Sequence, residues 1–173
     1  YAFGREITNF VFKNCFISTG GFINVKTNKI SRLTKEKYQK SKSKDDLKFI
    51  PDKIKEFKPN PKFLSTYNIT KPVLALLPGS RQQEIDKILP VMIESSRTFN
   101  NTYEIVVAKS DNLPEALYKK YIGRNEVKLV PNEYYNVLFH SKMAVVTSGT
   151  ATLETALCNV PQVVVYKTNP ITF

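Results

Sequence analysis

Two short stretches of the sequence combine residue types that could hold a phosphate group. The first, "LALLPGSRQQEI" (residues 74–85), is an apolar run that ends in Pro78, Gly79, Ser80 and Arg81 before a charged helix opening. Gly79 lets a ligand approach the backbone, Ser80 can cap the helix or donate a hydrogen bond, and the Arg81 guanidinium offers a planar fork for a phosphate. The same residues also fit a plain turn with a helix cap and a solvent-facing arginine, and spacing alone favours neither interpretation.

The second stretch, "TSGTATLE" (residues 147–154), places small hydroxylated residues around a glycine at a predicted helix start. Free N–H groups and the positive end of the helix dipole suit a diphosphate there, and Glu154 can accept hydrogen bonds from two vicinal ribose hydroxyls. The alternative is a capped helix in which Glu154 only complements the dipole. The candidate binding residues are Gly79, Ser80, Arg81, Ser148, Gly149, Thr150, Ala151, Thr152 and Glu154.

From Val73 onward, short β-branched runs alternate with amphipathic segments of helical length. This alternation predicts successive β-α-β units around a parallel sheet. The predicted strands are Val73–Leu77, Tyr103–Ala108, Val127–Val130, Met143–Thr147 and Gln162–Tyr166, and the predicted helices are Gln82–Thr98, Pro114–Tyr121, Glu133–His140 and Thr150–Cys158. Both stretches then follow the carboxyl end of a strand, where open parallel sheets bind ligands.

Within the first of these helices, the spacing of Ile85, Leu89, Met92 and Phe99 predicts one buried face, and Pro90 predicts a kink or a new first turn. Ahead of the first strand, "KPNPKFLSTYNITKP" (residues 58–72) predicts a short helix that begins after a proline. Residues 7–26 fit a hairpin around Gly20-Gly21, and residues 31–48 fit an exposed helix or a linker.

Other candidate chemistry is weaker. The one histidine, His140, falls at the end of a short helix and is expected to be structural or to cap that helix. Tyr134 and Tyr135 are expected to be packing residues. Cys15 and Cys158 lie far apart and form no metal-ligand spacing, which indicates a reduced, cytoplasmic setting and no metal site. No nucleophile–base pair is visible, so a general base is expected outside this chain.

Length and charge suggest one main domain with an appendage. The 173 residues suffice for one α/β domain with a sizeable core. Of the net charge of +11, residues 1–58 carry 14 Lys/Arg against 6 Asp/Glu, while the remainder carries 12 against 9. We therefore expect a basic appendage of unassigned role over residues 1–50 and a ligand-binding domain over residues 51–173. Neither end looks complete, and we expect a piece of a longer protein, cut within its last domain.

Taken together and in this order, the two stretches resemble the lipid-A-disaccharide synthase family. The matching segments are "KPVLALLPGSRQQEIDKILPVM" (residues 71–92), "FHSKMAVVTSGTATLETALCNVPQVVVYKTNPITF" (residues 139–173) and, less sharply, "DKIKEFKPNPKFLSTYNI" (residues 52–69). The resemblance implies a Rossmann-like parallel sheet flanked by helices, as one half of a GT-B fold, with the nucleotide sugar bound in this half. Residues 1–50 match nothing in the family.

The resemblance also implies the reaction. Family members transfer 2,3-diacylglucosamine from UDP-2,3-diacylglucosamine to 2,3-diacylglucosamine 1-phosphate and release UDP, inverting the anomeric centre with no metal or cofactor. By this resemblance, Arg81 and the helix start at Ser148–Thr152 grip the diphosphate, Glu154 holds the ribose, and Gly79 and Ser80 line the donor pocket. The family's N-terminal GT-B domain is not recognisable in this sequence, so we expect that domain or a partner chain to complete the site and this chain alone to be inactive.

The acyl chains of both substrates imply a peripheral protein at the cytoplasmic face of the inner membrane, and a basic surface would assist docking there. Two other functions fit the residues alone. One is a non-catalytic Rossmann-like nucleotide-binding module. The other is a nucleic-acid-binding protein that uses the lysines of residues 26–58, although no aromatic residues interleave with them in an RNA-binding pattern, and no nucleic-acid partner is expected.

Overall fold

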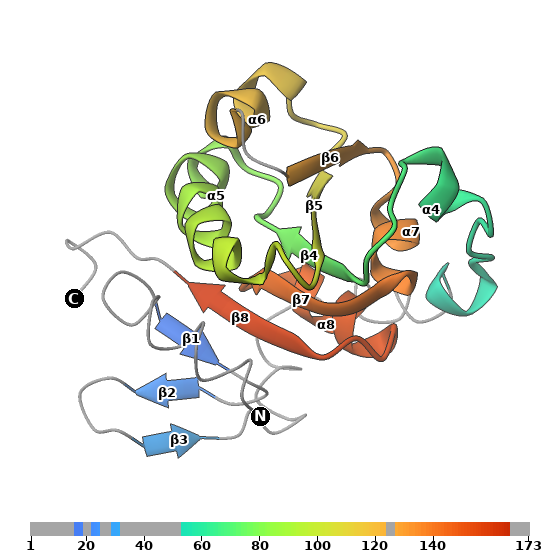
Figure 1. Ribbon diagram of the computed structural model, residues 1–173. Coiled ribbons are helices and arrows are strands. Elements are labelled where there is room, and N and C mark those ends of the chain that lie inside the picture. The colour runs from blue at the N-terminus through green and yellow to red at the C-terminus, as the bar shows by residue number, and fades with distance from the viewer. Residues whose placement is uncertain (1–15, 19–21, 25–28, 32–52, 124–126, 167–173) are drawn as a thin grey trace.

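The structure, a computed structural model, describes residues 16–18, 22–24, 29–31, 53–123 and 127–166. Its main feature is a six-stranded sheet in the order β1-β8-β7-β4-β5-β6 (Figure 1). The strands are β1 (Phe16–Ser18), β4 (Val73–Leu77), β5 (Glu104–Lys109), β6 (Val127–Pro131), β7 (Ser141–Thr147) and β8 (Gln162–Tyr166). The last five are parallel to one another, and β1 runs antiparallel to β8. This confirms the expected α/β fold.

Helices cover both faces of the sheet (Figure 1). One face carries α5 (Gln82–Ser96), the short 3-10 helix η1 (Arg97–Phe99) and α6 (Glu115–Ile122). The other carries α4 (Phe63–Thr66), α7 (Tyr134–Phe139) and α8 (Thr150–Leu157). Residues 53–56 are also helical. None of the helices in the described ranges is long and apolar enough to cross a membrane.

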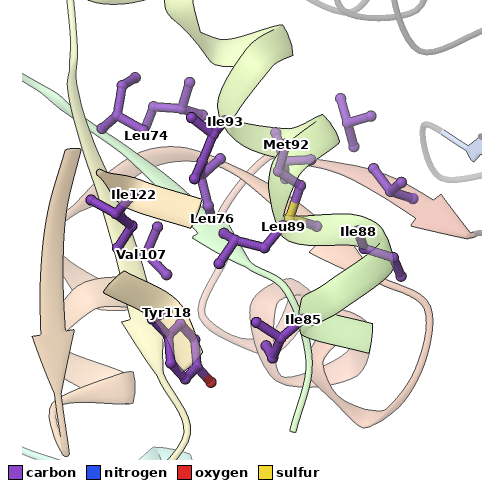
Figure 2. Close-up of a cluster of buried hydrophobic side chains, with 14 residues drawn as sticks. Leu74, Leu76, Ile85, Ile88, Leu89, Met92, Ile93, Val107, Tyr118 and Ile122 are labelled. Carbon is purple, nitrogen blue, oxygen red and sulfur yellow. The ribbon is translucent and has the colours of Figure 1, made fainter. Parts of the chain in front are cut away.

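The central strand β4 is buried on both faces, which explains its unbroken apolar sequence. Leu74 and Leu76 point into one core with α5 and α6, while Val73, Ala75 and Leu77 point into the other. Both sets follow from the two-residue period of a strand, and a strand covered on both sides reads as a continuous hydrophobic run. The core under α5 and α6 is drawn in Figure 2, with Ile85, Ile88, Leu89, Met92, Ile93, Tyr118 and Ile122 beside the strand residues.

The predicted face of α5 is confirmed at Ile85, Leu89 and Met92, which are buried, while Phe99 is half-buried against the same cluster. Helix α5 continues through Pro90, so the expected new first turn at that residue is wrong. Because proline lacks an N–H, the helix loses one internal hydrogen bond there, yet burial of Leu89 and Met92 on either side holds it together. The short helix after Pro61 is confirmed as α4, whose Phe63 is fully buried.

The strands near the N-terminus differ from the predicted hairpin. Strand β2 (Phe22–Asn24) pairs with β3 (Lys29–Ser31), while β1 pairs with β8. The hairpin around Gly20-Gly21 is therefore wrong, because the two strands that flank this glycine pair have other partners. Pairing between distant strands is not visible in a local pattern. Apart from Ser31, the predicted exposed helix or linker at residues 31–48 lies outside the described residues.

Candidate functional site

The strand order places a crevice at the centre of the sheet. Strand β4 is followed along the chain by β5 and β6 on one side, and the chain then returns to add β7 and β8 on the other. At such a switch point, the loops after the two central strands turn in opposite directions and leave a gap where ligands bind. Here those loops are residues 78–81, after β4, and residues 148–149, after β7.

A cavity of about 700 Å³ lies at this carboxyl edge. Its walls come from the ends of strands β4, β5 and β7, from the loops that follow β4, β5, β6 and β7, and from the starts of α5, α7 and α8. Of the nine residues predicted from the sequence, eight line it: Gly79, Ser80, Arg81, Ser148, Gly149, Thr150, Ala151 and Glu154. Thr152 is not among the lining residues, and its hydroxyl donates a hydrogen bond to the Gly149 carbonyl at 2.7 Å.

The loop after β4 is organised by Glu84 in the first turn of α5. One oxygen of its carboxylate, Oε2, accepts hydrogen bonds from the backbone N–H groups of Ser80 at 3.0 Å and Arg81 at 3.2 Å. Arg81 is the residue that caps α5, with extended backbone angles. Ser80 is therefore not the cap, and the two amide groups that an anion could use are already paired with an internal carboxylate.

Gly79 makes this arrangement possible. Its φ of +107° is one that side chains with a Cβ rarely adopt, and a Cβ at this position would lie 2.1 Å from Oε2 of Glu84. The glycine thus admits the Glu84 carboxylate to the loop. The Arg81 side chain is 83% exposed and its guanidinium lies 3.9 Å from the other Glu84 oxygen. Because it is exposed, this guanidinium is free to turn toward a phosphate, whereas the two backbone amides of the loop are paired with Glu84.

The loop after β7 offers a different kind of site. Gly149 caps α8, and among the residues that the structure describes, a Cβ added there would meet no atom within 4 Å. Thr147, at the end of β7, is 5% exposed and lines the cavity. Its hydroxyl has no hydrogen-bond partner among the residues that the structure describes. An unpaired buried hydroxyl beside a helix N-terminus suits an anionic or polar ligand.

Glu154 lies on α8 and faces the same cavity. The Tyr135 hydroxyl, from α7, donates a hydrogen bond to its Oε1 at 2.7 Å. Burial, together with this carboxylate, raises the pKa of Tyr135 well above its ordinary value. Burial and the same carboxylate raise the pKa of Cys158 from 9.0 to about 11. Tyr135 therefore does more than pack, which the sequence interpretation of this residue missed.

Several other lining residues were also missed. They are Lys53, Phe57, Glu84, Lys109, Ser110, Asp111, Asn112, Asn132, Glu133, Tyr134, Tyr135 and Asn136. Most follow β5 or β6, so the rule that singled out the loops after β4 and β7 would have found them. Asn132 has a positive φ of 59°, a conformation that asparagine tolerates better than most residues. Glu84 was visible as an acidic residue three positions after the cap.

His140 has the structural role expected of it. It caps the end of α7, its Nδ1 lies 2.8 Å from the Asn136 carbonyl oxygen, and its ring stacks on Phe63 with centroids 5.0 Å apart. In the described part of the chain, no group of three or more His, Cys, Asp or Glu residues is placed to hold a metal ion.

The strand order and the crevice define the class of the molecule, a Rossmann-like α/β domain. A model of the lipid-A-disaccharide synthetase family matches residues 48–173, which is more than half of the chain, and the chain therefore belongs to that family. This confirms the resemblance drawn from the two loop stretches.

Individual relatives agree with this membership. A lipid-A-disaccharide synthase from Coxiella burnetii (strain CbuK_Q154) is 38% identical over 109 residues, covering 61% of this chain and 29% of the relative. One from Sulfurihydrogenibium sp. (strain YO3AOP1) is 30% identical over 139 residues, covering 70% and 36%. One from Syntrophus aciditrophicus (strain SB) is 35% identical over 106 residues, covering 58% and 28%. The chain thus spans about a third of the length of these curated relatives.

Proposed function

We propose that the cavity binds the UDP part of a nucleotide sugar, and that the chain is the donor-binding part of a lipid-A-disaccharide synthase. The reaction would transfer 2,3-diacylglucosamine from UDP-2,3-diacylglucosamine to 2,3-diacylglucosamine 1-phosphate, forming the β-1,6-linked disaccharide and UDP. The observation that carries the proposal is that the loops after β4 and β7, which lie in the two stretches that resemble the family, line one cavity at the switch point of the sheet.

The two loops supply complementary groups for the diphosphate. Arg81 contributes an exposed guanidinium, and the start of α8 contributes the positive end of the helix dipole, which favours an anion. The Ser148 and Thr150 side chains line the cavity beside these groups. Negative charge builds on the departing diphosphate as its bond to the sugar breaks, and donors placed there stabilise that charge.

The remaining roles follow from position. Glu154 lies one turn into α8 and would accept hydrogen bonds from the ribose hydroxyls, beyond the diphosphate at the helix start. The acceptor sugar and the general base that takes its proton would come from outside this chain. We further propose a peripheral position at the inner membrane, because both substrates carry acyl chains and the net charge of +11 favours an anionic surface.

Thermal unfolding of the chain with and without UDP tests the donor site. A ligand that binds only the folded chain raises the unfolding temperature. UDP at millimolar concentration is expected to do so, and Arg81→Ala or Glu154→Ala should abolish the rise. Arg97→Ala and Glu94→Ala are matched controls, because these two residues pair with each other at the far end of α5. A folded chain that UDP does not stabilise would show that the assignment is wrong.

A further inference from the structure

The Tyr135 hydroxyl and the Glu154 carboxylate form a direct contact inside the cavity. They come from different helices, α7 and α8, and the hydroxyl oxygen lies 2.7 Å from Oε1 of the carboxylate. Both residues line the cavity. A carboxylate has about four positions at which it can accept a hydrogen bond, so one bond from a tyrosine leaves most of its capacity for a ligand.

The Tyr135 ring is itself held from the other side. The Phe57 ring packs against it with centroids 5.4 Å apart, and the Lys53 ammonium lies 5.2 Å from its centroid. Phe57 also stacks on Phe139, with centroids 5.5 Å apart and planes within 16°. Residues 53–57, which precede the first parallel strand, thus form a wall of the cavity through Lys53 and Phe57. These contacts hold the Tyr135 ring, and with it the hydroxyl, in place.

The protonation state of Tyr135 suits a permanent donor. Burial and the adjacent Glu154 carboxylate raise the pKa of its hydroxyl, so the proton remains in place throughout the neutral range. A neutral phenol beside an ionised carboxylate donates a charge-assisted hydrogen bond, which is shorter and stronger than one between neutral groups.

We propose that Tyr135 is a positioning residue that fixes the Glu154 carboxylate for the ribose hydroxyls of the nucleotide. This inference rests on the proposed function, because it assigns Tyr135 a part in holding the same ligand. The hydroxyl holds Oε1, which leaves Oε2 and the remaining capacity of Oε1 to accept hydrogen bonds from the ligand. The aromatic contact with Phe57 keeps the phenol, and through it the carboxylate, in one orientation.

The test compares UDP with 2′,3′-dideoxy-UDP, which lacks the two ribose hydroxyls, by calorimetric titration of the whole chain. Tyr135→Phe removes only the hydroxyl. It should weaken UDP binding about tenfold, as expected for a hydrogen bond to a charged group, and leave the affinity for the dideoxy analogue unchanged. Tyr166→Phe, at an exposed position of β8 outside the cavity, is the matched control and should change neither affinity.

Three other results would overturn the positioning role of Tyr135, and one of them would also overturn the proposed function. Equal weakening of both ligands by Tyr135→Phe would mean a general effect on folding and would overturn the positioning role. An unchanged affinity for UDP in Tyr135→Phe, alongside a loss in Glu154→Ala, would overturn this inference and leave the proposed function standing. Failure of the unaltered chain to bind UDP would overturn the proposed function and the inference with it.

Discussion

Replacement of Gly79 by alanine tests whether this glycine is needed to admit the Glu84 carboxylate to the loop after β4. The new Cβ would lie 2.1 Å from Oε2 of Glu84, so the carboxylate must leave the loop. The N–H groups of Ser80 and Arg81 then lose their acceptor, which costs about 1–2 kcal/mol by analogy with lost helix caps. The strained φ of +107° adds about 1–2 kcal/mol. We expect Gly79→Ala to lower the free energy of unfolding by about 2–4 kcal/mol in total.

A double-mutant cycle separates these two costs. Glu84→Ala alone should cost about 1–2 kcal/mol, because it removes the acceptor without straining the backbone. Gly79→Ala has already displaced Glu84, so the double variant should be no less stable than Gly79→Ala. The two changes would then be non-additive by about 1–2 kcal/mol, well above the error expected for independent sites.

Urea unfolding followed by circular dichroism measures each free energy. The matched control is Gly123→Ala, since Gly123 also has a positive φ, of +54°, but a new Cβ there would meet no atom of the described part of the chain within 4 Å. Gly123→Ala should lower the free energy of unfolding through backbone strain only. Its loss and that of Glu84→Ala should therefore add in the double variant. Additive costs for Gly79→Ala and Glu84→Ala would refute the view that the glycine exists to admit the carboxylate.

Two further predictions concern titration. The pKa of Cys158 is raised to about 11, so in a Cys15→Ser variant the rate of alkylation of this thiol should rise with pH to a midpoint near 11. In urea, which unfolds the chain, the midpoint should lie near 9.0. A midpoint of 9.0 in the folded chain would contradict the burial of Cys158 beside Glu154. Burial by itself would raise the pKa of Glu104, but the Thr70 amide and the Lys128 ammonium outweigh it and lower that pKa below 4.5. A lowered pKa stabilises the fold above the unfolded value and loses this effect as pH falls through the folded one. Glu104→Gln should therefore be less stable than the unaltered chain at pH 7, and the difference between their urea midpoints should disappear below pH 4.5. A difference that does not depend on pH would mean that Glu104 stabilises the fold by packing alone.

Much of the parallel sheet could be predicted from local pattern. The bounds of β4 and β8 coincide with the predicted strands, because runs of β-branched or apolar residues there are flanked by Pro and polar residues. Strand β7 begins two residues before the predicted Met143, since Ser141 pairs with Val73 across the sheet. That pairing is a tertiary fact, and the apolar pattern of β7 gives no sign of it.

The site was predictable to a smaller extent. A glycine, an arginine and a helix start could be found from their types and spacing, and the structure brings them to one cavity, although their binding roles remain predictions. The link between Tyr135 and Glu154 depends on how α7 packs beside α8, and the contact of Phe57 with Tyr135 joins segments 78 positions apart. Neither has a local signal. Glu84 had one, in its position three residues after the helix cap.

The adjacency of β4 and β7 has a consequence for how the chain folds. Strands β4, β5 and β6 can pair in the order in which they leave the ribosome, but β7 must return to the opposite side of β4, past the whole intervening segment. Such a long-range pairing forms slowly, because the closure of a long loop costs entropy before any contact compensates it. The two loops of the cavity meet only after this pairing. Binding of the proposed nucleotide would thus become possible only in one of the last steps of folding, and a partly folded chain with β4 to β6 in place would have only half of the pocket.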